Sequence, residues 1–372
     1  MPCLYCRGRS MPSCGIVGLP NVGKTTLFNA ITRGSAEVSN YPFTTIGKND
    51  AVIPVPDSRL AKLQSLAGQE EARPATFELV DIAGLVRGAH RGEGLGNEFL
   101  GHIRNVDAVA HVVRCFPAPH VSHVEGSIDP VRDIEVVDTE MALADLTVLD
   151  RRIAKVRSMM KASREHADEL HALEQVRSVL EAGVPIRNAS LPETVLQHLQ
   201  SIPLLTAKPR MIVANVGEDA SEGLENLQEW AAANHEMLYT IPAKLEADLS
   251  ELSPEEAAEF ARELGVDASP VESLIRAAYE LLGLVTFYTI VGARVTAWPI
   301  PRGCTAQKAA GRVHKDMEEG FIRAEVISYD ALIEYGSWHA ARDAGKVRAE
   351  GRDSVIHDGD VVLFRFTPPA KH

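Results

Sequence analysis

The sequence has few cysteines, no long apolar run and a deficit of positive charge. Five cysteines occur in 372 residues, and their odd number and scattered spacing argue against a disulfide framework and for a reducing compartment. No stretch of about 18 uncharged apolar residues occurs, so we expect no membrane span. The opening MPCLYCRGRSMPS lacks the apolar core of a secretory signal. A cytoplasmic globular protein is therefore expected.

The shortage of positive charge bears on possible partners. The formal net charge is −13, and phosphate contacts need Lys and Arg, so the chain is not an obvious nucleic-acid binder. We expect no DNA binding, and any contact with RNA requires local basic patches. The pair Cys3 and Cys6 has no second ligand pair at a zinc spacing. Residues 1–12 are therefore predicted to be a disordered extension.

Buried strands alternate with helical patterns through the first two thirds of the chain. The predicted helices include 25–32 and 96–106, and the predicted strands are 13–18, 76–81, 107–115, 211–215 and 238–242. Such alternation is typical of an α/β fold with a mostly parallel sheet covered on both faces. Cys14 and Cys115 fall in two of these strands, and the sequence does not show whether they respond to oxidation.

An insertion at about 133–205 interrupts this alternation. Apolar residues recur in heptad-like steps over two successive segments, from Ile134 to Met160 and from Leu170 to Leu180. This spacing predicts an antiparallel helical hairpin that projects as an arm. The alternative is two ordinary amphipathic helices packed on the main domain. Six Lys and Arg residues against one acid occur between Asp150 and Arg164, and they form either a solvated helix face or a contact for RNA phosphates.

The last quarter of the chain changes character. A connecting helix is predicted at 271–282, followed by short strands at 287–290, 293–298, 323–327 and 360–366 and one helix at 305–314. Together these elements predict a small α+β domain at 285–368.

The clearest motif is GLPNVGKTT at residues 18–26. The spacing of Gly18, Gly23, Lys24 and Thr25 fits the phosphate-binding loop, with a strand before it and a helix after it. Backbone N–H groups and the helix N-terminus then cradle phosphates. Lys24 places a charge on the β- and γ-phosphates, and the Thr25 hydroxyl ligates Mg²⁺.

Two further segments match the parts that sense a γ-phosphate. Asp81-Ile82-Ala83-Gly84 follows a strand, so Asp81 is expected to hold Mg²⁺ through water and the Gly84 N–H to sense the γ-phosphate. Thr45 is the expected switch threonine, with Thr44 as the near alternative. Leu85 stands where Ras-type GTPases carry a glutamine that orients water. The glycine-rich segment 88–97 then suits a moving switch.

The segment ANVGED at 214–219 is predicted to read the base. In an Asn-Lys-x-Asp reader, the Asp accepts both N–H donors of guanine. Here Glu218 is one methylene longer and Val216 replaces the lysine, so the matched guanine contacts are lost. Adenine could be held by Asn215, by backbone groups near Val216 and by apolar packing. The residues therefore favour ATP over GTP.

These motifs together resemble a known family. GLPNVGKTTLFNA, NYPFTTI, DIAGLVRGAHRGEGLGNEFL, HVVRCF and NVGE are similar to the Obg-like ATPases of the YchF subfamily, and the tail from Gly303 to Phe366 resembles that family's TGS domain. The resemblance implies a GTPase-like domain at 13–284 with an inserted helical arm, and a β-grasp domain at 285–368. It also implies ATP preference, slow hydrolysis and association with the ribosome.

The resemblance also assigns roles to single residues. It implies Mg²⁺ ligands at Thr25 and Thr45, a hydrophobic residue at Leu85, a base segment at Asn215, Val216 and Glu218, and an ATP loop made of Asn21, Val22, Gly23, Lys24, Thr25 and Thr26. His123, in HVSHVEG, is a candidate for positioning water, although a lone histidine is more often structural. Asn21 is a second candidate, through K⁺ binding.

Two classes of function follow from these observations. The leading hypothesis is an ATP-hydrolysing switch that acts on ribosomes as a monomer, with the large subunit and ribosomal RNA as partners. The alternative is an RNA- or ribosome-binding scaffold in which nucleotide only rigidifies the protein. A plain GTPase is disfavoured by Val216 and Glu218.

Overall fold

The computed structural model describes residues 11–38, 49–84, 95–118, 123–160, 166–217, 221–252, 256 and 270–368. The chain forms two compact units. The larger comprises Pro12–Ala51 and Glu78–Leu274, and the smaller includes Val52–Phe77 and Ile275–His372. Within the described part, no helix is both long and apolar enough to cross a membrane.

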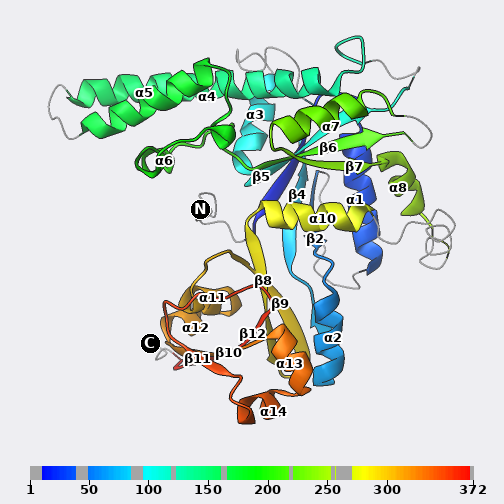
Figure 1. Cartoon of the computed structure of the whole chain (residues 1–372), viewed down its shortest axis with the longest axis vertical. Helices are drawn as coiled ribbons and strands as arrows, with labels where there is room; N and C mark the ends of the chain where they lie inside the picture. The colour runs from blue at the N-terminus through cyan, green and yellow to red at the C-terminus, as the bar shows by residue number, and fades with distance from the viewer. Residues whose placement is uncertain are drawn as a thin grey trace. The chain divides into compact units, whose positions relative to one another are not determined.

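A six-stranded sheet lies at the centre of the larger unit, in the order β2-β4-β1-β5-β6-β7 (Figure 1). Its strands are β1 Ser13–Val17, β2 Asp50–Pro54, β4 Thr76–Asp81, β5 Ala108–Cys115, β6 Arg210–Val216 and β7 Met237–Ile241. From β4 through β7 all neighbouring strands are parallel. Each of the five strands predicted from the sequence is present within one residue of its expected bounds. The carboxyl ends of these strands therefore meet at one edge of the sheet.

Helices cover this sheet. They include α1 Lys24–Val38, α3 Leu95–Asn105, α7 Leu224–Ala233 and α8 Ala243–Leu249. α1 packs against α8. Every residue of β1 and β5 is buried, as expected for central strands of a parallel sheet with both faces covered. The predicted α/β class is confirmed.

Cys14 and Cys115 lie fully buried in β1 and β5. Neither forms a disulfide, and burial raises the pKa of both thiols to about 12. Because the thiolate is the reactive form, neither residue is expected to react readily with oxidants near neutral pH.

The predicted helical hairpin is present as α4 Pro130–Met160 and α5 Ala167–Glu181, which lie side by side in Figure 1. Asp129 caps α4, because its Oδ1 accepts a hydrogen bond from the Arg132 N–H at 3.0 Å. The first turns of α4 belong to the body of the unit, since Ile134 packs with β5 and β6. Only the later turns depend on α5 and on α6 Glu193–Leu199 for their apolar contacts.

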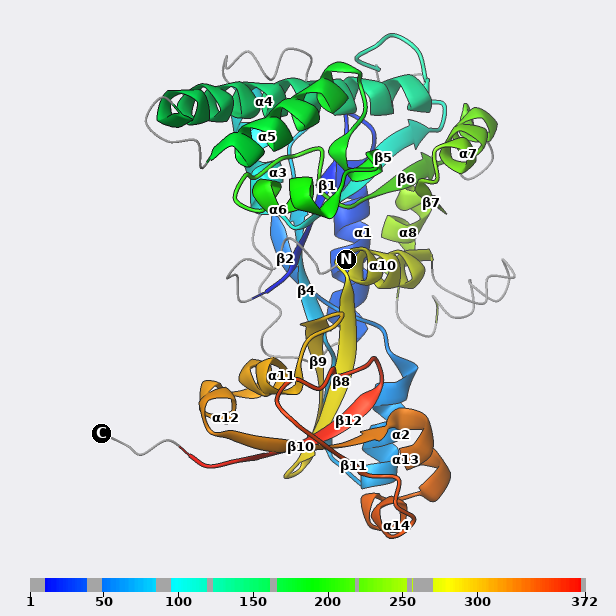
Figure 2. The same ribbon diagram turned by 60° about the vertical axis from the view of Figure 1, so that its left-hand side comes forward.

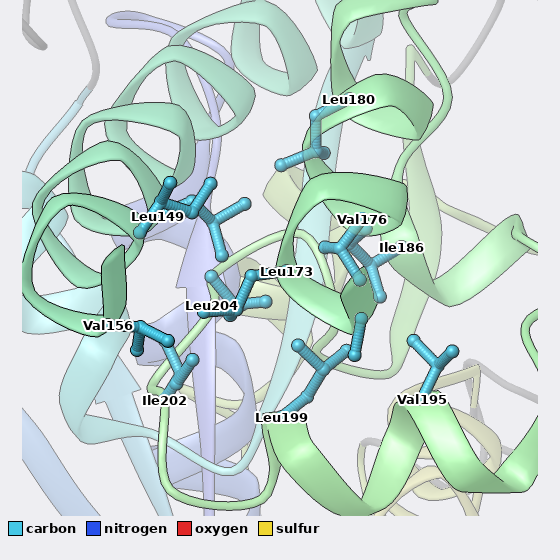
Figure 3. Close-up of a cluster of buried hydrophobic side chains, with 12 residues drawn as sticks. Leu149, Val156, Leu173, Val176, Leu180, Ile186, Val195, Leu199, Ile202 and Leu204 are labelled. Atoms are coloured by element: carbon cyan, nitrogen blue, oxygen red, sulfur yellow. The ribbon is translucent and has the colours of Figure 1, made fainter. Parts of the chain in front are cut away.

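One apolar cluster holds this distal half of the arm together (Figure 3). Its labelled members come from α4, α5 and the segment that returns to the sheet: Leu149, Val156, Leu173, Val176, Leu180, Ile186, Val195, Leu199, Ile202 and Leu204. From Leu149 onward, the stripe read from the sequence is therefore the buried seam between the two helices, as heptad-like spacing predicts.

Two of the basic residues near the arm's turn are less available for contact with RNA phosphates than the sequence indicates. Arg152 pairs with Glu169, and Arg157 pairs with Glu174 at 2.8 Å. Both carboxylates lie on α5, so each neutralises one arginine of α4. Lys161 and Arg164 lie outside the described residues. The described part of the predicted basic tip is thus partly neutralised by its own hairpin.

The smaller unit contains a second six-stranded sheet, in the order β11-β10-β12-β8-β9-β3. Its strands are β3 Glu71–Arg73, β8 Leu284–Val291, β9 Arg294–Pro301, β10 Phe321–Ser328, β11 Arg348–Glu350 and β12 Asp360–Phe366. Its helices are α2 Ser58–Ala67, α11 Ala306–Val313, α12 Lys315–Glu319, α13 Tyr329–Tyr335 and α14 Trp338–Asp343, and α10 Pro270–Leu281 leads into β8. Figure 2 shows α11 and α12 on one side of the strands, with α2 and α13 on the other. The predicted small α+β fold is present.

The smaller unit also recruits a segment that the sequence assigned to the first domain. β3 pairs in parallel with β9, with Glu71 opposite Arg294. Asp57 caps α2 by accepting from the Arg59 N–H at 3.0 Å, and the Tyr288 hydroxyl donates to the same carboxylate. Arg59 also pairs with Asp358 at 2.6 Å. Residues 52–77 are thus tied to the C-terminal sheet, while the boundary at residue 284 remains a prediction.

Candidate functional site

The loop between β1 and α1 packs closely against two strands of the sheet. Gly18 and Gly23 have φ values of +151° and +97°, which are strained for residues that carry a Cβ. A Cβ on Gly18 would lie 2.4 Å from the Val112 carbonyl oxygen, and one on Gly23 would lie 2.1 Å from Asn215 Nδ2. Both glycines are therefore required by close packing of the loop against β5 and β6.

Lys24 is held inside this loop. The residue is only 8% exposed, and its Nζ donates a hydrogen bond to the Leu19 carbonyl at 2.8 Å. Burial lowers the pKa of Lys24 to about 8, although the charge of Asp81 opposes this shift. A buried ammonium group with one backbone partner is well suited to gain from an incoming phosphate.

This lowered pKa predicts a pH-dependent affinity. Below pH 8 Lys24 is charged before ATP arrives; above it the amine is neutral, and binding must take up a proton. The affinity for ATP should therefore fall as the pH rises through 8, by up to about tenfold per unit. Titrations from about pH 7 to about pH 9.5 test this. In Lys24→Arg, whose guanidinium does not titrate there, the fall should disappear; an equal fall would assign it to another group.

Thr25 and Asp81 form the second part of the site. The Thr25 hydroxyl donates to Asp81 Oδ2 at 2.8 Å, and the buried Oδ1 has no partner among the described residues. Burial raises the pKa of this carboxyl group, with the Thr25 hydrogen bond and Lys24 opposing the shift. A hydroxyl group and a carboxylate with one unpartnered oxygen match the oxygen ligands that Mg²⁺ takes beside substrate phosphates. These residues fit a magnesium ion.

Gly84 lies against the same loop. A Cβ at this position would lie 2.9 Å from the Pro20 backbone nitrogen and 3.1 Å from Lys24 Nζ. The backbone after Asp81 therefore lies close to Lys24, and the role of Gly84 in sensing a γ-phosphate remains a prediction.

Asn215 joins three parts of the larger unit. Its Nδ2 donates to the Val22 carbonyl at 3.0 Å, and its Oδ1 accepts from the Ala243 N–H at 3.1 Å. The residue is 4% exposed. Asn215 thus fixes the phosphate loop relative to the start of α8, and its contact with a base remains a prediction. The sequence analysis did not identify Ala243, although it follows the last strand at the edge where the other site residues lie.

Asn215→Asp should remove one of the two hydrogen bonds of this side chain and keep the other. The acceptor for Ala243 remains, but an oxygen then faces the Val22 carbonyl. We expect a loss of about 1–3 kcal/mol in the free energy of unfolding and weaker ATP binding. Urea unfolding and calorimetry measure the two effects. Asn234→Ala, at an exposed residue whose Nδ2 bonds to the Trp230 carbonyl, is the control; an equal loss there would remove the special role of Asn215.

His123 is not brought to this loop by any described contact. Its Nε2 lies 2.9 Å from Asp133 Oδ2, and its Nδ1 accepts from the Glu125 N–H at 3.2 Å. Because Nδ1 is an acceptor, the ring proton is on Nε2 and is donated to Asp133. The side chain is 5% exposed. Both ring nitrogens are therefore engaged at the start of α4, and its role in positioning water remains a prediction.

The remaining predicted site residues divide into two groups. Thr45, Leu85 and Glu218 lie outside the described residues, as does most of the glycine-rich segment. Val216 ends β6, next to Asn215. Asn21 has a φ of +64°, a left-handed conformation that asparagine tolerates better than most residues. Val22 is fully buried, and Thr26 is partly exposed in the first turn of α1.

Family models match both ends of the chain. The model MMR_HSR1, described as "50S ribosome-binding GTPase", matches residues 13–151. The model YchF-GTPase_C, described as "Protein of unknown function (DUF933)", matches residues 284–367. The two matches fall on the phosphate-loop region and on the C-terminal sheet.

Individual relatives match almost the whole chain. It is 46% identical over 357 residues to the ribosome-binding ATPase YchF of Haemophilus influenzae, covering 95% of this chain and 98% of the relative. It is 44% identical over 361 residues to the Bacillus subtilis protein of the same name, with 95% and 99% covered. The solved structure of the Schizosaccharomyces pombe YchF GTPase has a TM-score of 0.87 at 33% identity, covering 97% and 99%. This agreement over nearly full length shows that the chain belongs to the YchF family of Obg-like P-loop proteins.

Proposed function

We propose that the protein is a ribosome-binding ATPase that prefers ATP over GTP and hydrolyses it slowly. The observation that supports this proposal is the arrangement around the phosphate loop. Lys24 and Thr25 of the loop lie beside Asp81, and Asn215 of β6 holds the loop through a hydrogen bond. Relatives named ribosome-binding ATPases support the assignment. A protein that binds ribosomes acts in the cytoplasm, and we propose that it does so as a monomer.

The choice of nucleotide rests on residues 215–218. The solved relative is described as a GTPase and the curated relatives as ATPases, so the names disagree. In this chain Val216 lacks the lysine stem that lies along guanine, and Glu218 is one methylene longer than the aspartate whose carboxylate accepts both guanine N–H groups. Without that bidentate contact, the main source of guanine selectivity is lost. ATP is therefore the proposed substrate.

The proposed reaction is hydrolysis of the terminal phosphate. A water oxygen bonds to the γ-phosphorus, the bond to the β–γ bridging oxygen breaks, and ADP, inorganic phosphate and a proton are released. Lys24 and the loop N–H groups stabilise the charge that develops on these oxygens. Thr25, Asp81 and Thr45 would hold Mg²⁺, which would supply further positive charge beside these oxygens. Asn21 is the residue proposed to favour K⁺.

Slow hydrolysis is expected because Leu85 and His123 are poorly suited to orient the attacking water. Leu85 cannot hydrogen-bond, and His123 would have to release Asp133 and the Glu125 N–H to contact a water molecule. We propose that ATP turnover is therefore low in the isolated protein and rises when the ribosome rearranges the segment around His123.

The hydrogen bonds of the His123 ring also favour a second candidate function. If this ring stays bound to Asp133, the protein is a nucleotide-gated ribosome-binding scaffold with negligible hydrolysis. Phosphate release at saturating ATP, measured with and without purified ribosomes, separates the two. Stimulation that is lost in His123→Ala supports the ATPase, whereas ribosome binding without phosphate release supports the scaffold.

A further inference from the structure

The hydrogen bonds of His123 hold its ring against the start of α4. The ring donates from Nε2 to Asp133 Oδ2 at 2.9 Å and accepts at Nδ1 from the Glu125 N–H at 3.2 Å. The side chain of Asp133 is 1% exposed, so the carboxylate is shielded from water. Both ring nitrogens are thus occupied, and neither can contact an attacking water without losing its present partner.

Asp133 is held in place by contacts that do not involve His123. Its Oδ1 accepts from the Arg132 guanidinium group at 3.0 Å, and the same guanidinium group donates to Ser127 Oγ at 2.9 Å. The Asp133 N–H donates to the Asp129 carbonyl at 3.1 Å. Asp133 therefore keeps its position and one charged partner when His123 leaves it.

The pair differs from an aspartate and histidine arranged for catalysis. In a catalytic arrangement, one ring nitrogen faces the carboxylate and the other faces the reacting group. Here the second nitrogen faces the N–H of Glu125, two residues along the same turn. That turn is closed by a hydrogen bond of 3.0 Å from the Gly126 N–H to the His123 carbonyl, and Gly126 has a φ of +78°. The ring is therefore folded back on its own segment, which is the geometry of a resting state.

Release of the ring has a small cost. A buried carboxylate that loses its only cationic partner is strongly destabilising, but Asp133 retains Arg132. Val124, which follows His123, is 50% exposed, so a partner can reach the segment that carries the ring. An equilibrium between a held and a released ring then depends on few hydrogen bonds, and a partner that prefers one state can shift it.

We infer that Asp133 is a positioning residue that restrains His123 until a partner draws residues 123–129 away from α4. This inference deepens the proposed function and rests on its assignment of His123 to orienting water. It names Asp133 as the residue that keeps ATP turnover low in the isolated protein. Weakening the pair should therefore raise turnover, whereas loss of a purely structural hydrogen bond would lower it or leave it unchanged.

The test uses the full-length variant Asp133→Asn, which keeps the shape of the side chain. Its single oxygen must serve two donors, and the charged guanidinium group of Arg132 binds an oxygen more strongly than the N–H of a neutral imidazole does. The ring of His123 then keeps at most one of its two hydrogen bonds. Turnover at saturating ATP should rise about tenfold without ribosomes, with an unchanged KM for ATP. Phosphate release measures both quantities.

Three comparisons show whether the gain passes through His123. With saturating ribosomes, Asp133→Asn and wild type should reach the same rate, so ribosomes should stimulate the variant about tenfold less. In a His123→Ala background, Asp133→Asn should not change turnover. Asp145→Asn is the matched control, because Asp145 is also a buried carboxylate of α4 but accepts from the N–H groups of Leu205 and Thr206, each at 2.8 Å. It should retain wild-type turnover.

Several results would overturn the inference. These are unchanged or lower turnover in a folded Asp133→Asn protein, an equal gain in Asp145→Asn, or a gain that persists without His123. Hydrogen exchange of wild type needs no variant: the Glu125 amide should exchange faster when ribosomes stimulate turnover, and unchanged protection would also contradict the restraint.

The wild-type protein separates this inference from the proposed function. If it releases no phosphate from ATP with or without ribosomes, the proposed function fails. If ribosomes stimulate it but Asp133→Asn behaves as wild type, only the restraint fails.

Discussion

Replacing Lys24 by alanine should reduce ATP turnover by at least about 1,000-fold, which corresponds to about 4 kcal/mol of lost transition-state stabilisation. The reason is geometric. The buried Nζ has the Leu19 carbonyl as its hydrogen-bond partner, so its charge is placed inside the loop before nucleotide arrives. Alanine removes the single cation that the loop itself provides.

Phosphate release at saturating ATP measures this effect, and calorimetry shows whether ATP still binds. Lys62→Ala is the control, since Lys62 is exposed on α2 in the smaller unit. It should retain wild-type turnover. If Lys24→Ala kept more than about a tenth of the wild-type rate with an intact fold, the loop would not be the site of chemistry.

Replacing Asp138 by alanine should cost about 3–5 kcal/mol in the free energy of unfolding of the larger unit. Asp138 on α4 accepts from Arg187 at 2.7 Å and from Arg210 at 2.8 Å, and Glu236 also pairs with Arg210. The two arginine side chains are 8% and 4% exposed. The variant leaves two largely buried cations with one carboxylate, and Arg187 loses its only ion-pair partner in the described part.

The matched control lies on the same helix. Asp150 pairs with Arg177, but both side chains are exposed, so Asp150→Ala should cost less than about 1 kcal/mol. Urea unfolding followed by Trp230 fluorescence reports on the larger unit, in a background where Trp298 and Trp338 are phenylalanine. Equal effects of the two substitutions would show that the Asp138 network does not stabilise the base of the arm.

The sequence predicted those features that depend on local pattern. Five of the six strands in the sheet of the larger unit, the seam of the helical hairpin and the phosphate loop all follow from periodicity or from glycine and lysine spacing. The convergence of Lys24, Thr25 and Asp81 follows as well, because a parallel sheet brings its carboxyl ends to one edge.

What the sequence did not show depends on contacts between distant segments. β3 has three residues, and its partner β9 lies more than 200 positions away, so no local pattern indicates the pairing. Asn215 bonds to the Ala243 backbone N–H, which any residue except proline could provide. Strand register places Arg323 opposite Arg365 on antiparallel strands, which the local sequence does not indicate either. His123 lies in the segment HVSHVEG, but the sequence does not show its hydrogen bonds to Asp133 and Glu125.

The most direct test of the central claim is calorimetric titration of nucleotide-free protein with ATP and with GTP, side by side, in Mg²⁺ and K⁺. The account predicts tighter binding of ATP, because Val216 and Glu218 remove the guanine contacts. Tighter binding of GTP would contradict it, and residues 214–219 would then not be the base reader.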